Sequence, residues 1–256
     1  MKRSAIDAVG AALFLLGLVL VWHVVAQARL VSPLFFPEPL RVADAIWRQV
    51  TLGTIWEPLA MTASRMLGGW GAAMIIGVAL GALIGLSPIA STYLAPSLEF
   101  LRTLPASAVL PIFILLMGLT TEMILAVIAF GSLWPVLLST VHGFRALEPR
   151  LNEVASNLEL GRIESFLKIT LPSAIPDILA GARVSIGFAL ILAIVAEMLS
   201  SKPGLGNNIL LASRSFRSAE LYAGIVILGL LGAGTTGLLG FVEARLLRWR
   251  PSADQA

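Results

Sequence analysis

The chain has 256 residues, of which 57% are hydrophobic and only 13% are charged, whereas soluble domains usually carry about 25% charged residues; this composition indicates a protein embedded in a lipid bilayer. The net charge of +3 comes from basic residues scattered between apolar stretches, which argues against a nucleic-acid partner. With no cysteine and only His23 and His142, the sequence excludes disulfides and thiolate metal sites and predicts no metal centre.

Six stretches are long and apolar enough to cross a membrane, which takes about 20 residues each. Because backbone groups in lipid must bond within their own segment, they are predicted to be helices, in an all-α polytopic fold. Their approximate ranges are 6–26, 66–86, 98–119, 123–141, 178–199 and 221–246. The whole chain, 1–256, is predicted to be one transmembrane domain, with the first helix and an outer loop in 1–63, core helices in 64–246 and a cytoplasmic loop at 145–177.

The first stretch resembles a secretory signal peptide at its ends. Lys2 and Arg3 precede it, and a possible cleavage site follows at Ala26-Gln27-Ala28. Its apolar part is longer than a signal peptide usually has, so we expect a retained anchor. A slight excess of basic residues on the side of the N-terminus and of the 145–177 loop predicts that both termini are cytoplasmic.

Small residues line two of the stretches and suggest close helix packing. The second stretch has Gly77, Gly81 and Gly85, and the sixth has a longer set: Gly229, Gly232, Ala233, Thr236, Gly237 and Gly240. We interpret both sets as packing within the chain, with a contact between subunits as the alternative. The third stretch contains Pro105 and Pro111, which interrupt its helix and make it a candidate for lining a pore.

The loop at 145–177 has the pattern of two short amphipathic helices joined near Gly161. Apolar residues recur at helical spacing on both sides of this glycine: Leu151, Val154, Ala155 and Leu158 before it, and Ile163, Phe166, Leu167 and Thr170 after it. Glu164 and Lys168 are spaced to form an ion pair. Pro172 is expected to end the second helix. An apolar face in the cytosol predicts a protein partner, and folding onto the chain's own helices is the alternative.

This loop resembles the "EAA" loop of the membrane subunits of binding-protein-dependent ABC importers. The resemblance starts from Glu153-Val154-Ala155, Leu158 and Leu171-Pro172 and extends over about 61–245. It includes Ala174-Ile175-Pro176, Ala180-Gly181-Ala182-Arg183, Ala196-Glu197-Met198, Gly204-Leu205-Gly206, and Leu101-Arg102-Thr103-Leu104-Pro105 leading to Leu110-Pro111. Together these residues are most similar to the branch that serves sulfonates, taurine, nitrate and bicarbonate.

The resemblance implies a channel subunit in the bacterial inner membrane that imports a small solute, such as one of these anions. Two separate ATPase subunits would bind ATP and Mg, a second permease copy would complete the channel as a homodimer, and an external binding protein would deliver the solute. The chain itself has no G-x-x-x-x-G-K-[ST] motif, so we expect no cofactor and no enzymatic activity of its own. The same branch is associated with pyrimidine-like and aromatic substrates, which stay an alternative.

The resemblance also implies which residues couple the channel to the ATPase. These are Glu153, Ala155, Leu158, Glu159, Gly161, Leu171 and Pro172. The family usually has glycine at the position of Glu159, in the turn between the two short helices. Glycine suits a left-handed turn and glutamate does not. We therefore expect either a first helix that is half a turn longer or a turn rebuilt around Gly161.

Charged residues and prolines within the apolar stretches are candidates for the translocation path, because intramembrane charges are costly and often functional. These candidates are Arg102, Pro105, Pro111, Arg183 and Glu197. Arg102 alternatively forms a structural ion pair with Glu99, one helical turn away. Glu197, about 21 Å along the helix from Arg183, alternatively bonds the loop that carries Gly204 and Gly206.

Two rival function classes have weaker support. A membrane-embedded enzyme would need clustered acidic, histidine or serine side chains within the apolar stretches, and no such cluster is visible. An ion-coupled secondary transporter often has internal repeats, and the two halves of this sequence show no convincing repeat. The ATP-driven importer is therefore the predicted class.

Overall fold

The computed structural model describes residues 2–249, which form helices and connecting turns and contain no strand. This agrees with the predicted all-α class. The helices are α1 (Lys2–Gln27), α2 (Pro39–Thr51), α3 (Trp56–Leu86), α4 (Pro88–Arg102), α5 (Ala106–Met117), α6 (Thr121–Arg145), α7 (Pro149–Asn157), α8 (Arg162–Ser165), the π-helical turn η1 (Phe166–Thr170), α9 (Leu171–Ser200), α10 (Leu205–Arg214) and α11 (Ser218–Leu246).

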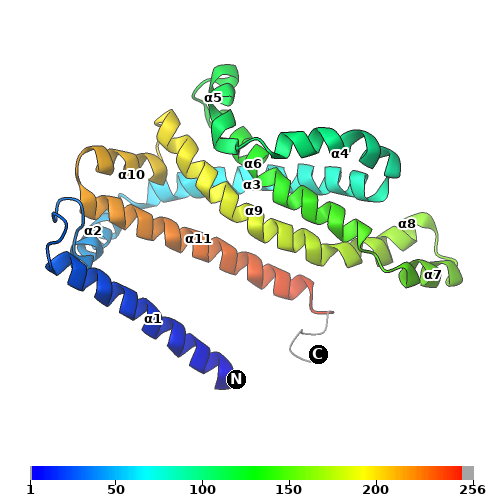
Figure 1. The fold of residues 1–256 in the computed structure, drawn as a ribbon, viewed down its shortest axis with the longest axis horizontal. Helices are drawn as coiled ribbons and strands as arrows, with labels where there is room; N and C mark the ends of the chain where they lie inside the picture. Colours follow the sequence, from blue (N-terminus) through cyan, green and yellow to red (C-terminus); the bar gives the residue numbers. More distant parts are fainter. Residues whose placement is uncertain (1, 250–256) are drawn as a thin grey trace.

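The long helices run along one common axis (Figure 1). Four helical segments among the described residues are long and apolar enough to cross a membrane: α3, α6, the continuous run from α8 to α9, and α11. The pair α4 and α5 forms a fifth candidate that bends by 96°. The described part of α1 contributes a shorter apolar helix, Leu13–Gln27. The predicted six stretches therefore correspond to these four segments, the bent pair and α1.

The core of the bundle lies where α3, α6 and α9 pack together. A cluster of fully buried side chains joins α3 to α6 and α9, including Met66, Ile124 and Ala189. A Cβ atom added at Gly77, Gly81 or Gly85 would come within 2.9, 2.6 or 2.8 Å of Val136, Thr140 or Phe144, respectively. These glycines are thus required for the contact between α3 and α6, which confirms the predicted packing within the chain.

The small residues of α11 do not pack in the same way. An added Cβ atom at Gly229 or Gly237 would meet nothing within 4 Å, and one at Gly232 would lie 3.0 Å from Leu190. The prediction that this set packs within the chain is therefore wrong at Gly229 and Gly237. A contact with another subunit stays open as the alternative for this face of α11.

The third predicted helix has different boundaries from those expected. It starts at Pro88, ten residues before position 98, and is broken at Thr103–Pro105 between α4 and α5. Pro105 adopts an extended conformation as the residue before α5, whereas Pro111 lies inside α5 without ending it. The predicted interruption at Pro111 is wrong. The start was missed because residues 91–93, Ser-Thr-Tyr, lower the hydropathy of this part of α4.

The helix expected to end at Pro172 continues through it. Leu171 keeps α-helical dihedral angles, φ −65° and ψ −48°, and the run from Arg162 to Ser200 is one segment of 39 residues. The π-helical turn η1 directly precedes Pro172, and such a turn accommodates an extra residue in the helical ladder. The preference against helix before proline is overridden here by the flanking helix.

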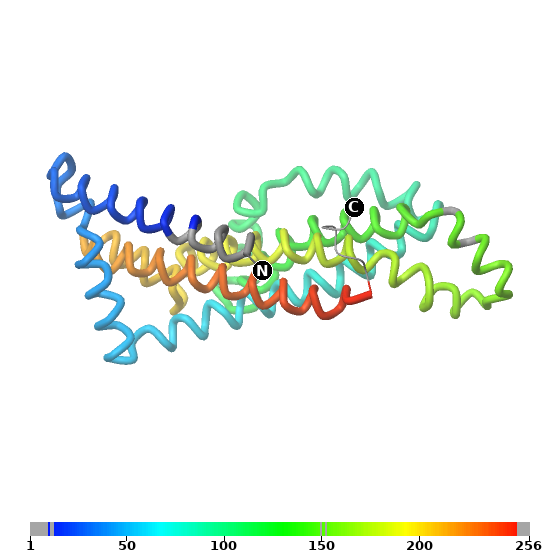
Figure 2. The backbone as a smooth tube through the Cα atoms, turned by 90° about the horizontal axis from the view of Figure 1, so that it is seen from below, coloured from blue at the N-terminus to red at the C-terminus, as the bar shows by residue number. Residues whose placement is uncertain are grey.

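The predicted outer loop in 1–63 contains α2, and the segment between the fifth and sixth predicted stretches contains α10. Both lie at one end of the bundle, and α7 and α8 lie at the other end (Figure 1). Helices α1 and α11 lie lengthwise in the bundle and are antiparallel: α1 ends, and α11 begins, at the end with α2 and α10 (Figures 1 and 2). The end of α11 is therefore nearer to α7 than its start is (Figure 1).

Candidate coupling loop and translocation path

The turn after α7 is a Schellman motif, in which the chain leaves the helix through a left-handed residue. The amide of Glu159 donates to the carbonyl of Ser156 (3.1 Å), and the amide of Leu160 donates to that of Ala155 (3.0 Å). Glu159 is the left-handed residue, with φ 50°. A side chain in this conformation costs roughly 1–2 kcal/mol relative to right-handed helix, and glycine avoids this cost.

Glu159 therefore adopts a left-handed backbone geometry that glycine suits better than glutamate. The first helix is not extended, since α7 ends at Asn157, and Gly161 has extended dihedral angles, φ −59° and ψ 158°. Both expectations for this turn are thus wrong. The reason is that the two hydrogen bonds of the Schellman motif hold the turn in place despite the unfavourable residue.

The predicted coupling residues differ strongly in exposure. Ala155 is 7% exposed and Leu158 is 64% exposed, so they do not share one accessible apolar face as expected. Glu153, Glu159 and Gly161 are exposed, and Leu171 and Pro172 are half-buried at the start of α9. The most exposed apolar side chains after the turn belong to Ile163 (77%) and Leu167 (55%). Their helical spacing was visible in the sequence, but they were not among the predicted contact residues.

The three most exposed apolar side chains of the loop, Leu158, Ile163 and Leu167, define its accessible apolar surface, and Val154 is also exposed (46%). A groove borders this surface and is lined by Gly161, Arg162, Ile163, Glu164, Leu167 and Lys168. Lys168 donates to Glu164, which confirms the predicted i,i+4 pair. The surface combines apolar side chains with a polar rim, as protein-binding surfaces usually do.

The base of the loop is fixed to the bundle by aromatic stacking. Phe166 in η1 stacks on the buried Phe144 at the end of α6, with ring centroids 6.2 Å apart and an interplanar angle of 12°. Ala174 and Ile178 of α9 complete this cluster. A Cβ atom added at Gly143 would lie 2.9 Å from the Cβ of Asp177, so the two helices approach closely here. The loop therefore has little freedom to move independently of α6 and α9.

Arg102, a path candidate, lies at the end of α4 and donates to Glu99, one turn earlier. Both residues line a pocket of about 150 Å³ between α4 and α6. Apolar side chains form most of the pocket, including Leu98 and Leu137, and Arg145 contributes a second guanidinium. Pro105 and Pro111 are exposed. The predicted ion pair between Glu99 and Arg102 is confirmed, and the same arginine borders a cavity.

Glu197 is fully buried rather than open to a path. Its carboxylate accepts hydrogen bonds from the hydroxyl of Thr62 (2.9 Å), the guanidinium of Arg65 (2.8 Å) and the amide of Gly206 (3.1 Å). The alternative prediction, in which Glu197 forms a hydrogen bond with the loop that carries Gly204 and Gly206, is therefore the one observed. The path-lining assignment of Glu197 is wrong in this arrangement.

Two partners of Glu197 were missed by sequence reasoning, Thr62 and Arg65. Both were placed in or next to an outer loop, because the second apolar stretch was expected to begin at position 66, whereas α3 begins at Trp56. The sequence did hold one signal for this contact: Arg65 directly precedes the apolar stretch 66–86 and could belong to the same helix. Arg65 also donates to the carbonyl of Pro203 (2.6 Å), and Thr62 accepts from the amide of Leu205 (2.9 Å).

Arg183, the remaining path candidate, forms an ion pair with Glu243 of α11. Its side chain is 51% exposed, on the α11 side of α9, whereas Arg102 lies on α4. The predicted path residues are thus not gathered at one place. No group of three potential metal ligands occurs among the described residues.

Comparison with known proteins identifies relatives over most of the chain. The profile of the family described as "Binding-protein-dependent transport system inner membrane component" matches residues 73–248. A Bacillus subtilis (strain 168) protein designated an aliphatic sulfonates transport permease, SsuC, is 33% identical over 93% of this chain and 86% of its own length. The nitrate import permease protein NrtB of Leptolyngbya laminosa is 33% identical over 76% of this chain and 70% of its own.

A further relative is the taurine transport system permease protein TauC of Escherichia coli (strain K12), which is 28% identical over 91% of this chain and 86% of its own. Among solved structures, an amino acid ABC transporter crystallised with histidines has a similar fold, with a TM-score of 0.62. That similarity covers 78% of this chain and 98% of the other at 19% identity, so it supports the fold alone.

Proposed function

This chain belongs to the family of binding-protein-dependent transport system inner membrane components, and from this premise we propose how it works within an ABC importer. As the permease subunit, it contributes helices to a channel through the bacterial inner membrane. We place α7 and α8 at the cytoplasmic end, where two ATPase subunits bind ATP and Mg, and α2 and α10 at the outer end, where a binding protein delivers the solute. Family membership favours this importer over an ion-coupled transporter or a membrane-embedded enzyme.

The exposed apolar surface formed by Leu158, Ile163 and Leu167 carries the proposal for the ATPase contact. This surface lies on short helices at one end of the bundle, and its base is fixed to α6 through Phe144 and Phe166. Apolar side chains this exposed outside the bilayer are stabilised by burial in a partner. One such loop per chain suits an assembly of two permease copies with two ATPases.

Co-purification with the ATPase tests this assignment. We expect Leu158→Asp and Ile163→Asp to abolish association, because each would bury an unpaired charge in the contact. Leu40→Asp is the matched control, since Leu40 is also highly exposed (66%) but lies on α2 at the other end. Full association of both loop variants with the ATPase would show that the contact lies elsewhere.

For the solute, we propose a small oxyanion. The relatives are named for sulfonate, nitrate and taurine transport, and Arg102 lines the pocket between α4 and α6. Arginine binds planar and tetrahedral oxyanions through several parallel hydrogen bonds. Uptake of labelled sulfonate and nitrate by membrane vesicles that hold the assembled complex distinguishes these solutes from a neutral pyrimidine.

A further inference from the structure

A second cluster of arginines lies at the end of the bundle with α2 and α10, far from the coupling loop. It borders a pocket of about 390 Å³ whose walls come from the segment after α1, from α2 and from the start of α11. The lining residues are Pro33, Leu34, Arg41, Arg48, Phe216, Arg217, Ser218, Ala219 and Glu220. No residue of this pocket belongs to the coupling loop or to the pocket of Arg102.

The cations of this pocket outnumber its anions. Arg41, Arg48 and Arg217 face one carboxylate, Glu220, which gives a lining charge of 3 − 1 = +2. Glu220 accepts from Arg217 at 2.7 Å. Arg48 donates through Nε to the backbone carbonyl of Asp44 (3.4 Å), and Arg41 has no hydrogen bond or ion pair within residues 2–249. Two guanidinium groups are therefore not paired with a carboxylate.

The spacing on α2 brings these cations to one side of the helix. Arg41 and Arg48 are seven residues apart, or about two turns, so both side chains project from the same face. The acidic residues of this segment, Glu38 and Asp44, do not line the pocket. Because basic residues are usually fewer at the outer face of a membrane protein, a cluster at this end calls for a local role.

Part of the pocket lining is apolar and firmly positioned. Pro33, Leu34 and Phe216 form it, and Phe216 packs edge-to-face on Phe35 with ring centroids 6.0 Å apart. Phe216 has a left-handed φ of 53°, a costly conformation for an aromatic residue. Hydrogen bonds from Phe216 to Ser213 and from Arg217 to Ala212 hold this turn. These two bonds form the Schellman turn that ends α10, and they fix Phe216 beside the pocket.

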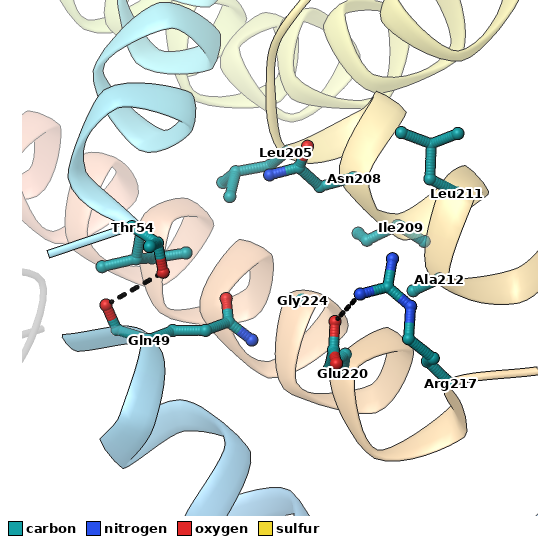
Figure 3. A pocket seen from close by; sticks show the side chains of 11 residues that line it. Gln49, Thr54, Leu205, Asn208, Ile209, Leu211, Ala212, Arg217, Glu220 and Gly224 are labelled. Atoms are coloured by element: carbon teal, nitrogen blue, oxygen red, sulfur yellow. Dashed lines mark hydrogen bonds and ion pairs between the residues drawn. The ribbon is translucent and has the colours of Figure 1, made fainter. Parts of the chain in front are cut away.

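A neighbouring pocket of about 230 Å³ shares the pair Arg217 and Glu220 (Figure 3). In this view the amides of Gln49 and Asn208 approach the same pocket from α2 and α10. No hydrogen bond of either side-chain amide to another described residue is present. Additional polar groups that can still accept or donate hydrogen bonds therefore lie next to the arginine cluster.

We propose that the pocket bounded by Arg41, Arg48 and Arg217 binds an oxyanion that carries an apolar group. The guanidinium groups would hold the oxyanion through charge-assisted hydrogen bonds, and the wall of Pro33, Leu34 and Phe216 would cover the apolar group. Two molecules share this chemistry: a soluble alkyl sulfonate and the phosphate of an acidic phospholipid. Only the first source rests on the proposed transport function, as a solute held at the outer mouth before translocation.

Binding to the purified full-length chain tests this site without ATPase or uptake, so its outcome is independent of the importer assignment. Butanesulfonate is titrated into the chain in nanodiscs of neutral phosphatidylcholine and followed by calorimetry. Binding of phosphatidylglycerol is measured separately by native mass spectrometry. We expect at least one probe to bind, and the double variant R41Q/R48Q to weaken that binding by about tenfold or more, because two charged hydrogen-bond donors are lost.

Arg214→Gln is the matched control, because Arg214 is an exposed arginine at the same end of the bundle but does not line the pocket. The Arg214→Gln variant should bind each probe with the same affinity as the natural chain. Butanesulfonate binding alone would identify the solute as the source, and phosphatidylglycerol binding alone would identify the lipid. The proposal is overturned if neither probe binds, or if the double variant binds as tightly as the control.

Discussion

Arg65 of α3 donates a hydrogen bond from Nη1 to the Oε1 atom of Glu197 on α9 at 2.8 Å, in a contact where Glu197 is fully buried. The same two side chains also reach the next segment of the chain, through the carbonyl of Pro203 and the amide of Gly206. One buried ion pair therefore joins α3, α9 and the turn that leads into α10.

Replacing Arg65 with leucine should destabilise the protein strongly. Glu197 would be left as a buried carboxylate without a cation, which costs about 3–5 kcal/mol. We expect a clear drop in the thermal unfolding midpoint of the purified chain. The double variant R65L/E197L should recover part of this loss, since no charge is then left uncompensated. Equal stability of Arg65→Leu and the natural chain would show that the pair contributes little.

The contact between α3 and α6 should not tolerate a methyl group at Gly81. The added Cβ atom would lie 2.6 Å from the Cβ of Thr140 and 2.9 Å from the carbonyl oxygen of Leu137. Overpacking of this kind costs about 1–3 kcal/mol. Gly81→Ala should lower the thermal unfolding midpoint, while Gly71→Ala in the same helix, where an added Cβ meets nothing within 4 Å, should leave it unchanged or raise it.

Replacing Glu159 with glycine should stabilise the loop after α7. The substitution removes a side chain from a left-handed position, φ 50°, and the gain is roughly 1 kcal/mol. We expect slower hydrogen exchange in residues 149–160. Gly161→Ala, at an extended position that alanine adopts without strain, is the comparison and should not change the exchange. Faster exchange in Glu159→Gly would contradict the left-handed assignment.

Removing the charge of Arg102 should reduce transport more than it reduces assembly. Arg102 borders the pocket between α4 and α6, and its loss would remove a cation available to an oxyanion. In Arg102→Gln we expect initial uptake to fall by about tenfold, as for the loss of one charge-assisted contact, with the yield of the complex retained. Arg248→Gln, at an exposed position after the end of α11 and outside this pocket, should transport normally. Normal uptake by the Arg102→Gln variant would show that Arg102 does not line the translocation path.

The proposed orientation can be tested because the natural chain has no cysteine. Asn157 at the end of α7 and Ser215 after α10 are both exposed, and these two helices lie at opposite ends of the bundle (Figure 1). A single cysteine at Ser215 should react in intact cells with a thiol reagent that does not cross the inner membrane, and one at Asn157 should react only after the membrane is opened. The reverse pattern would invert the orientation and place the coupling loop outside.

The fold class and the approximate helix positions were predictable because apolar length is a strong signal in membrane proteins. Helix ends were less predictable where polar residues occur within a helix, as at Arg65 in α3 and at residues 91–93 in α4. Proline was also a weak guide. Thr103–Pro105 breaks the helix, whereas Pro111, Pro172 and Pro176 lie within helices, because neighbouring segments or a π-helical turn compensate for the missing hydrogen bond.

The candidate sites were only partly predictable. The coupling loop was found from its helical spacing and its resemblance, but the burial of Ala155 within the chain is not indicated by its spacing. The partners of Glu197 come from a helix more than 130 positions earlier in the chain, as the separations of Thr62 and Arg65 from it show. Contacts at such distance in sequence follow from the packing of α3 on α9, which local patterns do not specify.

The continuous helical segment from Arg162 to Ser200 can carry a displacement from the coupling loop to the other end of the bundle. Its 39 residues give a rod of about 58 Å at 1.5 Å per residue. A tilt of about 5° about one end of such a rod displaces the other end by roughly 5 Å, about one turn of helix. Since Glu197 lies near the far end and is bonded to α3 and to the turn before α10, any swing of this rod moves those segments with it.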